Sequence, residues 1–462
     1  MINLRDFNPN FYARPSLPAL ASTSTDAGRR TLVVPAKTAA ALASADFYTA
    51  VAVSLDLSVA ASWDTTSGTD YTVADNRAGK DFYLYATTSG LILSANATVP
   101  TGFDASTSRK IGGFHCLCLS VGTISGHSLT GFLTGDILPA SIWDLQWKPA
   151  CSPEGMVYSA EAGVWVDIYL QSGTGATTRS AYLATTTDGR NYWDHQDDLA
   201  TVGKRMLSDA EFQQIALGSP EQVSIAGSVD PVTTGGHRST SGATNGTSTS
   251  AASPSTDISA AENPQKLTVT LCGTAPVEVS INPTGLNTGS LIAAALQTAI
   301  RAAIPWAGGL TVTYGTTYVI SCPGSFGVSA SVVITAGSSN DCTAALKLGV
   351  ANGGVEVNGN LGRRIISNIG CEDCTGTLYQ WVDGGHIYRN HDTTYNGAWS
   401  WKTTGQNRGQ QYTQGADGAV GLLAGGAWTF GSACGSRCRN ADGIRSATAA
   451  NRGSRGCARL KE

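Results

Sequence analysis

The chain has 462 residues, of which 14% are charged, 42% are hydrophobic and 54 are glycine. This length exceeds what one hydrophobic core organises, and many glycines with few charges exclude a protein built from long charged helices. The formal net charge of −4 argues against binding of a polyanion over the whole surface. The first residues do not resemble a secretory signal, and no stretch of about 18 apolar residues predicts a membrane span. We therefore expect a chain that folds in the cytosol.

Residues 1–45 contain one short β-like run, Thr31 to Pro35, among proline, serine, threonine and alanine. Such a small segment cannot bury enough surface alone, so we expect it to pack against copies of itself or against another domain. From Phe47 onward apolar residues alternate with polar ones, and further β-like runs extend to Val121. This period of two predicts a small antiparallel β domain, a β-sandwich, over residues 46–135.

Another pattern begins at residue 136 and continues to residue 242. Val164 to Leu170 predicts a strand. Ser208 lies three residues before Glu211, which is the spacing of a capping box, and Gly218 follows as a stop signal. The sequence therefore predicts a helix that begins after Ser208.

Residues 239–262 contain almost no large apolar side chain and predict a flexible linker. Strand-like runs follow, together with one helix from Leu291 to Ile304 whose apolar residues share a face. A second glycine-rich stretch, Gly353 to Gly362, closes this pattern. We expect an inserted α+β module with its linkers over residues 243–359, and we expect 136–242 and 360–462 to form one domain.

In the last part of the chain, small residues from Ala427 to Ala433 alternate with Trp428, Phe430 and Ser432. As a strand, this stretch would bury its aromatic side chains and expose its small ones. A run rich in glycine, serine, asparagine and arginine follows, and seven basic against two acidic residues occur from Trp428 to Glu462. We predict that both parts form one exposed face with arginines at its edge.

The basic end permits three interpretations. It is a solvated surface whose arginines bond to carbonyl groups, a site for an anionic cell-surface ligand such as lipopolysaccharide or an acidic glycan, or a site for nucleic acid. Nucleic acid is disfavoured because no stacking aromatic residues lie among the arginines.

The cysteines and histidines raise the question of a metal site. Without a secretion signal, most of the eleven cysteines are predicted to be small buried thiols rather than a disulfide framework. Two candidate ligand sets for zinc or another metal are Cys371, Cys374, Cys434, Cys438 and Cys457, and His386, His391 and Asp392. The first has a CxxxC spacing that is unusual for zinc, and the second does not lie on one helical face. We expect neither a metal nor a cofactor.

Two segments, Ile137 to Gly242 and Leu361 to Glu462, resemble the C-type-lectin-fold receptor-binding proteins of bacteriophage tails that are diversified by retroelements. The resemblance rests on WDL (Trp143 to Leu145), PEGMV (Pro153 to Val157), WVDIYL (Trp165 to Leu170), GKR..SDAEF (Gly203 to Phe212), NIGCEDC (Asn368 to Cys374), GSR (Gly435 to Arg437) and RGC (Arg455 to Cys457). Between GSR and the last RG lie 17 residues, which is a spacing typical of that family. Residues 1–135 are similar in layout to the family's trimerising β-prism and small β domain.

The resemblance implies a mainly β protein with α+β parts: a β-prism-like trimerisation or virion-attachment segment, a small β-sandwich, and a C-type lectin fold interrupted by the inserted module. It implies a homotrimer at the fibre tip or baseplate of a virion that contacts other tail proteins. Its partner would be a host surface receptor, either a protein, a glycan or lipopolysaccharide, with no nucleic acid and no membrane insertion.

The resemblance also places the ligand-facing, diversified positions. Carried over position by position, they are Ala427, Thr429, Gly431, Ala433, Asn440, Asp442, Gly443, Ala447, Ala449, Asn451 and Arg452. We add Arg445 to this set on account of its charge.

Two other classes of function remain open at this point. The chain would be purely structural if another tail protein finds the host. An enzyme is the less favoured class: a formylglycine-generating type would use Cys434 and Cys438, and a glycan depolymerase would use carboxylates from Asp373, Asp383 and Asp392. Because no supporting base or motif surrounds these residues, we expect no catalytic activity.

Overall fold

The computed structural model describes most of the chain. The described residues are 20–22, 25–43, 46–64, 69–225, 240–241, 245–272, 274–304, 307, 309–322, 331–357, 363–388, 399–403, 410–414 and 419–461. Among these residues, no helix combines the length and the apolar character needed to cross a membrane. Of the predicted segment 1–45, residues 1–19, 23–24 and 44–45 lie outside the described residues.

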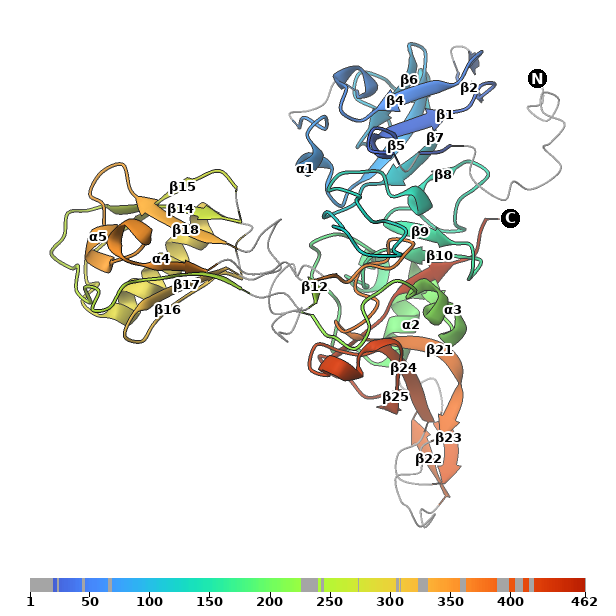
Figure 1. Ribbon diagram of the computed structural model, residues 1–462. Helices are drawn as coiled ribbons and strands as arrows, with labels where there is room; N and C mark the ends of the chain where they lie inside the picture. The colour runs from blue at the N-terminus through green and yellow to red at the C-terminus, as the bar shows by residue number, and fades with distance from the viewer. Residues whose placement is uncertain are drawn as a thin grey trace. The chain divides into compact units, whose positions relative to one another are not determined.

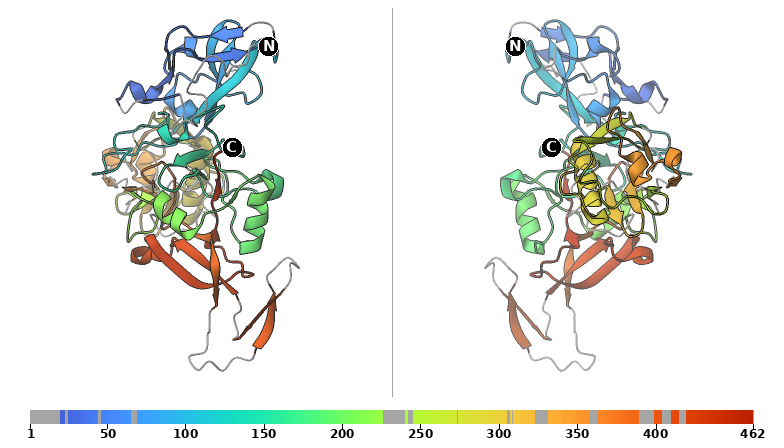
Figure 2. Two further views of the ribbon diagram at one scale, coloured as in Figure 1. Left: turned by 90° about the vertical axis from the view of Figure 1, so that its right-hand side faces the viewer. Right: turned by 90° about the vertical axis from the view of Figure 1, so that its left-hand side faces the viewer.

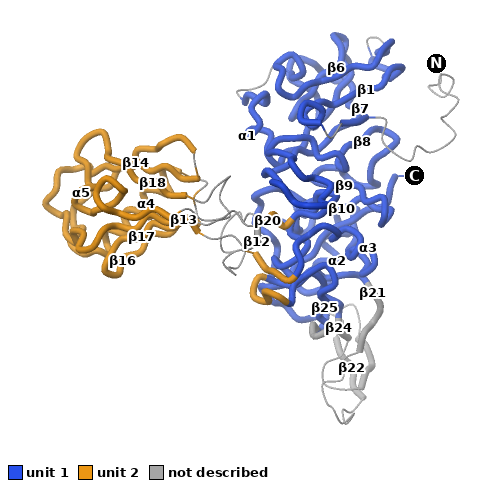
Figure 3. The backbone as a smooth tube through the Cα atoms, viewed as in Figure 1, with its two compact units in different colours: residues 1–221, 366–427, 433–462 blue, residues 222–365, 428–432 orange. Residues whose placement is uncertain are grey.

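The chain forms two compact units (Figure 3). Unit 1 consists of residues 1–221, 366–427 and 433–462, and unit 2 consists of residues 222–365 and 428–432. Unit 2 thus interrupts unit 1 in the sequence.

The N-terminal part of unit 1 is built on a four-stranded antiparallel sheet in the order β6–β5–β7–β8 (Figure 1). These strands are β5 (Asp81–Thr87), β6 (Gly90–Ser94), β7 (Ser108–His115) and β8 (Trp143–Asp144). Two small sheets accompany it, formed by β1 (Thr31–Val34) with β4 (Val53–Asp56) and by β2 (Ala39–Ala41) with β3 (Asp46–Tyr48). Their apolar residues share one core that extends from Leu20 to Ile142.

The middle of unit 1 is a second four-stranded sheet in the order β11–β27–β10–β9. Its strands are β9 (Met156–Ser159), β10 (Val164–Asp167), β11 (Arg205–Met206) and β27 (Gly456–Ala458). The strand predicted from Val164 is therefore confirmed, although it ends at Asp167 rather than Leu170. Because β27 lies between β10 and β11, the end of the chain completes a sheet that begins 300 residues earlier.

Two helices belong to this part of unit 1, α2 (Tyr192–Thr201) and α3 (Asp209–Ile215). The capping box predicted for α3 is confirmed: the Ser208 hydroxyl accepts from the amide of Glu211 at 3.3 Å, and a Glu211 carboxylate oxygen accepts from the amide of Ser208 at 2.7 Å. Helix α2 was not predicted, although Asn191 caps it by accepting from the amide of Asp194 at 3.0 Å.

The C-terminal part of unit 1 contains a third sheet in the order β25–β24–β21–β26. Its strands are β21 (Tyr379–Tyr388), β24 (Ala419–Gly425), β25 (Gly435–Ile444) and β26 (Arg452–Gly453), and a separate pair is formed by β22 (Trp399–Thr403) with β23 (Gln410–Gln414). Helix α3 packs against β21, β24 and β25, as the views of Figure 2 show. Short helices elsewhere are α1 (Ala74–Arg77) and the 3-10 turns Gly28–Arg30, Ala60–Ser62, Pro139–Ser141, Gly175–Thr177, Val350–Asn352 and Gly431–Ala433.

Unit 2 has its own core between two sheets and a helix. The sheet orders are β15–β14–β18 and β16–β17–β13–β19. The elements are β13 (Gly246–Thr249), β14 (Gln265–Leu271), β15 (Val277–Ile281), α4 (Gly289–Ala303), β16 (Thr311–Tyr314), β17 (Tyr318–Cys322), β18 (Val332–Ala336), α5 (Thr343–Leu346) and β19 (Val355–Val357). The predicted helix is confirmed as α4, and its Ile292, Leu296 and Ile300 are fully buried.

The prediction of a flexible linker over residues 239–262 is wrong. Residues 246–249 form β13, which pairs with both β17 and β19 and therefore lies inside a sheet. Gly246 and Ser248 are buried while Thr247 and Thr249 are half-buried, which is the alternation of a strand. Composition did not reveal this strand because its side chains are small and its neighbours supply the apolar contacts.

The two ends of unit 2 meet in a short strand pair. Strand β12 (Thr240–Ser241) pairs with β20 (Arg363–Arg364), and Ser241 lies opposite Arg363. If the residues between β12 and β20 were removed, a short loop could join the two strands as a hairpin.

This pairing predicts the outcome of a deletion. Removing residues 243–359 joins residue 242 to residue 360 and leaves a four-residue loop between Ser241 and Arg363. We expect the shortened protein to keep a cooperative thermal transition in circular dichroism, because the cores of unit 1 contain no residue of the deleted segment. A broad, non-cooperative melt would show that unit 1 depends on unit 2 for its stability.

Candidate functional site

The predicted binding residues lie in the part of the chain that runs from the end of β24 through β25 to β26. Strand β25 pairs with β24, and β26 pairs in parallel with β21, so that Arg452 lies opposite Tyr379 and Gly453 opposite Gln380. Strand β27 follows directly. The segment 425–452, which we call the terminal segment, is therefore held at both ends by strand pairing.

Arg455 fixes the position at which the terminal segment re-enters the sheet. Only 1% of its surface is exposed. Its guanidinium donates to the carbonyl oxygens of Asp167 at 2.7 Å and Ile168 at 2.6 Å, to the carbonyl of Glu372, and to Oε1 of Gln380 at 3.0 Å. These acceptors belong to the end of β10 and the residue after it, to the loop before β21 and to β21 itself, so one side chain ties three parts of the chain together.

A buried ion pair lies beside this contact. The Nζ atom of Lys204 is 2.6 Å from Oδ1 of Asp167, and the other carboxylate oxygen of Asp167 accepts from the amide of Gly456 at 3.1 Å. Burial lowers the pKa of Lys204, but the attraction of Asp167 outweighs it and the net shift is upward. Lys204 therefore stays charged and holds β10 next to β27.

A polar network holds Ser454, the residue that directly follows β26. The Nδ1 atom of His195, on α2, lies 2.9 Å from Oε1 of Gln171 and 3.1 Å from the hydroxyl of Ser454, and Gln171 in turn donates to Asp198 at 3.1 Å. Burial, with a smaller contribution from the charge of Arg190, lowers the pKa of His195 to about 3. His195 is therefore a neutral, structural residue at physiological pH.

Arg445 was predicted to extend into solvent, but it is buried. It is only 5% exposed, and its guanidinium carbon lies 4.4 Å from the ring centre of Tyr192 and 5.4 Å from that of Trp193, both on α2. Its carbonyl oxygen accepts from the amide of Tyr192 at 3.0 Å. The prediction that Arg445 is a donor at an exposed edge is wrong, because two aromatic rings offer a cation a favourable buried position.

Arg452 is also packed against an aromatic ring. Its guanidinium carbon lies 5.4 Å from the ring centre of Trp381, and burial lowers the pKa of Arg452. Trp381 contacts Tyr192 edge to face, with ring centres 5.8 Å apart, and the Tyr192 hydroxyl donates to Asp383 at 3.0 Å. Both arginines of the predicted site therefore brace the terminal segment against α2 and β21.

The predicted strand from Ala427 to Ala433 is wrong. Strand β24 ends at Gly425, and Gly425 and Gly426 have φ values of 89° and 84°, which favour glycine. A Cβ atom at Gly425 would lie 2.4 Å from the carbonyl oxygen of Cys374, so larger residues do not fit there. The chain turns at these glycines and continues as a 3-10 turn at Gly431–Ala433.

This turn changes which side chains are exposed. Ala427 is fully buried, and the Cys434 thiol donates to its carbonyl at 3.2 Å. Phe430, predicted to be buried, is 41% exposed, and Trp428 is half-buried. The expected separation into an aromatic inner face and a bare outer face does not exist, because alternation requires an extended strand.

The remaining predicted positions differ in their exposure to solvent. Thr429 and Ala433 are exposed, whereas Gly431, Asn440, Ala447, Ala449, Asn451 and Arg452 are half-buried. Asp442 and Gly443 belong to β25, and the side chain of Asp442 lies outside what the structure describes. Besides Phe430, four exposed residues of the same segment were not predicted as ligand-facing: Ser432, Arg437, Thr448 and Ala450.

Sequence reasoning missed the residues that support the terminal segment. Tyr192 and Trp193 come from an unpredicted helix, and Glu221 lies far from the segment in sequence. A Glu221 carboxylate oxygen accepts from the amide of Ser436 at 2.9 Å, at the start of β25. The adjacent aromatics after a capping asparagine were the available signal for α2; nothing in the sequence indicated the contact of Glu221.

The structure describes part of the alternative metal and enzyme sites. Among the described residues, no group of three or more histidine, cysteine or acidic side chains is arranged to hold a metal ion. His391 and Asp392 lie outside the described residues. Asp373 is buried and accepts from Thr377 at 2.9 Å, and burial raises the pKa of the half-buried Cys438 thiol. The raised pKa means that the Cys438 thiol is not activated as a nucleophile.

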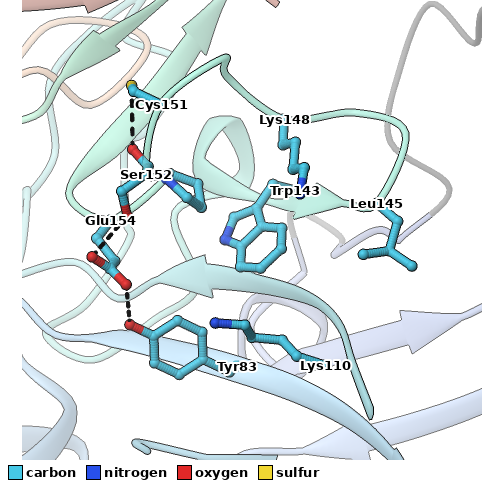
Figure 4. A pocket seen from close by; sticks show the side chains of 9 residues that line it. Tyr83, Lys110, Trp143, Leu145, Lys148, Cys151, Ser152 and Glu154 are labelled. Atoms are coloured by element: carbon cyan, nitrogen blue, oxygen red, sulfur yellow. Dashed lines mark hydrogen bonds between the residues drawn. The ribbon is translucent and has the colours of Figure 1, made fainter. Parts of the chain in front are cut away.

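A small cavity lies elsewhere in unit 1 (Figure 4). It has a volume of about 140 Å³ and is lined by Tyr83, Lys110, Trp143, Leu145, Lys148, Cys151, Ser152, Pro153 and Glu154. The Glu154 carboxylate accepts from the Tyr83 hydroxyl at 2.6 Å and from the Ser152 hydroxyl at 2.8 Å. These bonds give Glu154 a role in joining β5 to the loop before β9.

Comparisons with known proteins agree with the architecture. Residues 23–144 match a family model described as the Mtd second domain. A tail fiber receptor-binding protein of Bordetella phage BPP-1 is 30% identical over 191 residues, which are 36% of this chain and 49% of that protein. The chain thus spans about half the length of the curated relative that it matches.

Solved structures extend the similarity over nearly the whole chain. The Major Tropism Determinant U1 variant aligns with a TM-score of 0.53 and 20% identity, and the M1 variant with a TM-score of 0.54 and 19% identity. Each alignment covers 96% of this chain and 84% of the solved one. The resemblance noted from sequence motifs is therefore confirmed, and so is the mainly β class with a C-type lectin fold.

The contacts of Arg455 predict a large loss of stability on substitution. Replacing Arg455 with methionine removes the donors to three buried carbonyl oxygens and to Gln380, so we expect unfolding to become easier by roughly 3–5 kcal/mol. Arg459, which is exposed directly after β27, provides the matched control, and Arg459→Met should cost less than about 0.5 kcal/mol. Urea denaturation measures both; similar midpoints for the two variants would contradict the anchoring role.

The low pKa of His195 predicts a pH dependence of stability. Between its folded pKa of about 3 and an unfolded value of about 6.5, the unfolded chain binds more protons, so stability falls as the pH is lowered. The slope contributed by this residue is at most about 1.4 kcal/mol per pH unit. We expect His195→Gln to flatten the fall in melting temperature between pH 6 and pH 4. An unchanged pH profile would show that His195 is protonated in the folded protein.

Proposed function

We propose that this protein is a receptor-binding protein of a bacteriophage tail fibre, located at the tail of the virion. The observation that carries the proposal is the combined similarity: a tail fiber receptor-binding protein shares 30% identity over 191 residues, and tropism determinant structures share the fold over 96% of the chain. That relative is named for the binding of a receptor. The likeness to the solved structures supports the same scaffold for this chain.

The ligand-binding surface that we propose consists of the exposed parts of the terminal segment. Thr429 lies on the turn after Ala427, Ala433 is the last residue of the 3-10 turn, and Thr448 and Ala450 lie on the loop before β26. Arg445 and Arg452, with Ala427, form the frame beneath these positions rather than the contact surface. Both arginines pack on aromatic rings, so the contacts that hold the segment do not involve the exposed side chains, which can vary without changing the fold.

Further parts of the proposal concern assembly and chemistry. We propose a homotrimer, in which three copies of a weak site act together and raise the apparent affinity by avidity. We also propose that the protein is not an enzyme, since its named relatives are a receptor-binding protein and tropism determinants. The alternative, a purely structural tail component, would leave host recognition to another chain.

Adsorption competition separates these possibilities. We expect the purified protein to block adsorption of the corresponding phage to its host, and a double variant Thr429→Glu/Thr448→Glu to block it at least about tenfold less well, because two weak contacts of about 1 kcal/mol together correspond to more than that factor. The control Thr88→Glu/Ala160→Glu adds the same charge at two other exposed positions, one after β5 and one after β9.

Three measurements accompany this test. Circular dichroism must show that both variants are folded, and light scattering should give the mass of three chains. If the wild-type protein fails to compete with virions, the protein is a structural component rather than a receptor-binding one. If the folded Thr429→Glu/Thr448→Glu variant competes as well as the wild type, or no worse than the control variant, the binding surface lies outside the terminal segment.

A further inference from the structure

Two buried cysteines of unit 2 lie in contact although they are 50 positions apart in the chain. Cys272 directly follows β14, and Cys322 is the last residue of β17. Strands β14 and β17 belong to different sheets of this unit (Figure 1). Their sulfur atoms are 3.2 Å apart, and the two side chains are 1% and 0% exposed. The contact lies within the hydrophobic core of unit 2.

The backbone around both residues brings the sulfur atoms together. Cys272 has a φ of 53°, a left-handed conformation that is unfavourable for a residue with a Cβ atom. Its amide donates to the carbonyl of Ser331 at 2.9 Å, which holds it in this position. Cys322 pairs with Gly246 on β13, so β13 places no side chain opposite this cysteine.

Two plainer interpretations account for less of this arrangement. A shared metal ion would need more ligands, and among the described residues no cluster of three or more histidine, cysteine or acidic side chains exists. Ordinary packing of two thiols does not require a left-handed residue at the point of contact. The sulfur atoms need to approach by only about 1.2 Å to reach the bonded distance of about 2.05 Å.

We propose that Cys272 and Cys322 form a disulfide bond that links the two sheets of unit 2 when the protein meets an oxidising medium. The oxidant is a small disulfide such as glutathione disulfide. One cysteine thiolate attacks it and releases one glutathione, and the second cysteine thiolate attacks the protein sulfur of the mixed disulfide and releases another. The two protein sulfurs lose two electrons, the glutathione disulfide gains them, and the two cysteine protons end on the two glutathione thiols.

This bond would stabilise unit 2 by restricting its unfolded state, because it closes a long loop of the chain. Both thiols are buried in the folded protein, so the reaction requires a local opening of the end of β14 or of β17. The inference concerns unit 2 only and does not depend on the proposed receptor-binding function.

Mass spectrometry of the full-length protein tests the proposal. The folded protein is incubated with glutathione disulfide at pH 8, then unfolded in urea and alkylated without reductant. We expect nine of the eleven cysteines to carry the alkyl group and one linked peptide pair to contain Cys272 and Cys322. A sample that is unfolded before oxidation should instead give a mixture of pairings.

Single variants provide the controls. Cys272→Ala and Cys322→Ala should each abolish the linked pair, whereas Cys342→Ala, which removes another buried thiol of the same core, should retain it. Mapping of the wild-type protein decides the question by itself if a variant fails to fold. Eleven alkylated cysteines, a glutathione adduct that remains on either residue, or a link from Cys272 to another cysteine would overturn the proposal.

Discussion

The buried guanidinium of Arg455 is the contact on which the architecture of unit 1 depends. It satisfies the carbonyl oxygens of Asp167, Ile168 and Glu372, which come from two segments some 200 residues apart. A buried positive charge is costly unless it is fully hydrogen-bonded, and here four acceptors meet that requirement. The neighbouring Lys204–Asp167 pair follows the same rule. Together they determine where the end of the chain enters the sheet, and therefore where the terminal segment ends.

In the terminal segment, the residues that hold the fold differ from the residues that are exposed. The long side chains Arg445 and Arg452 point onto aromatic rings, and the glycines at 425 and 426 accept backbone conformations that other residues resist. The stabilising contacts are thus concentrated in a few residues. The exposed positions contribute little to the core, so substitutions there carry a small penalty in stability. Such a division suits a surface whose composition changes while its fold stays constant.

Unit 2 satisfies its own packing requirements. Its core is formed by residues between Ile258 and Leu348, and its ends meet in the β12–β20 pair. An insertion of this kind costs the host fold little, because the chain leaves and returns at neighbouring positions. The contact of Cys272 with Cys322 lies inside this core and connects its two sheets, which gives unit 2 a means of stabilisation separate from that of unit 1.

Local sequence patterns determined the elements whose signals are local. The Ser208–Glu211 capping box and the apolar face of α4 each depend on residues within a few positions of one another, and both were predicted correctly. The motifs shared with a known family also indicated the lectin-like fold. Only the tertiary structure decided the rest. The stretch after Gly425 has the alternation of a strand but turns away, since Cys374 and Cys434 crowd both glycines. Strand β13 has no apolar pattern and exists because β17 and β19 flank it. Arg445 has the sequence context of an exposed charge, and it is buried because α2, some 250 residues earlier, supplies two rings at the right place.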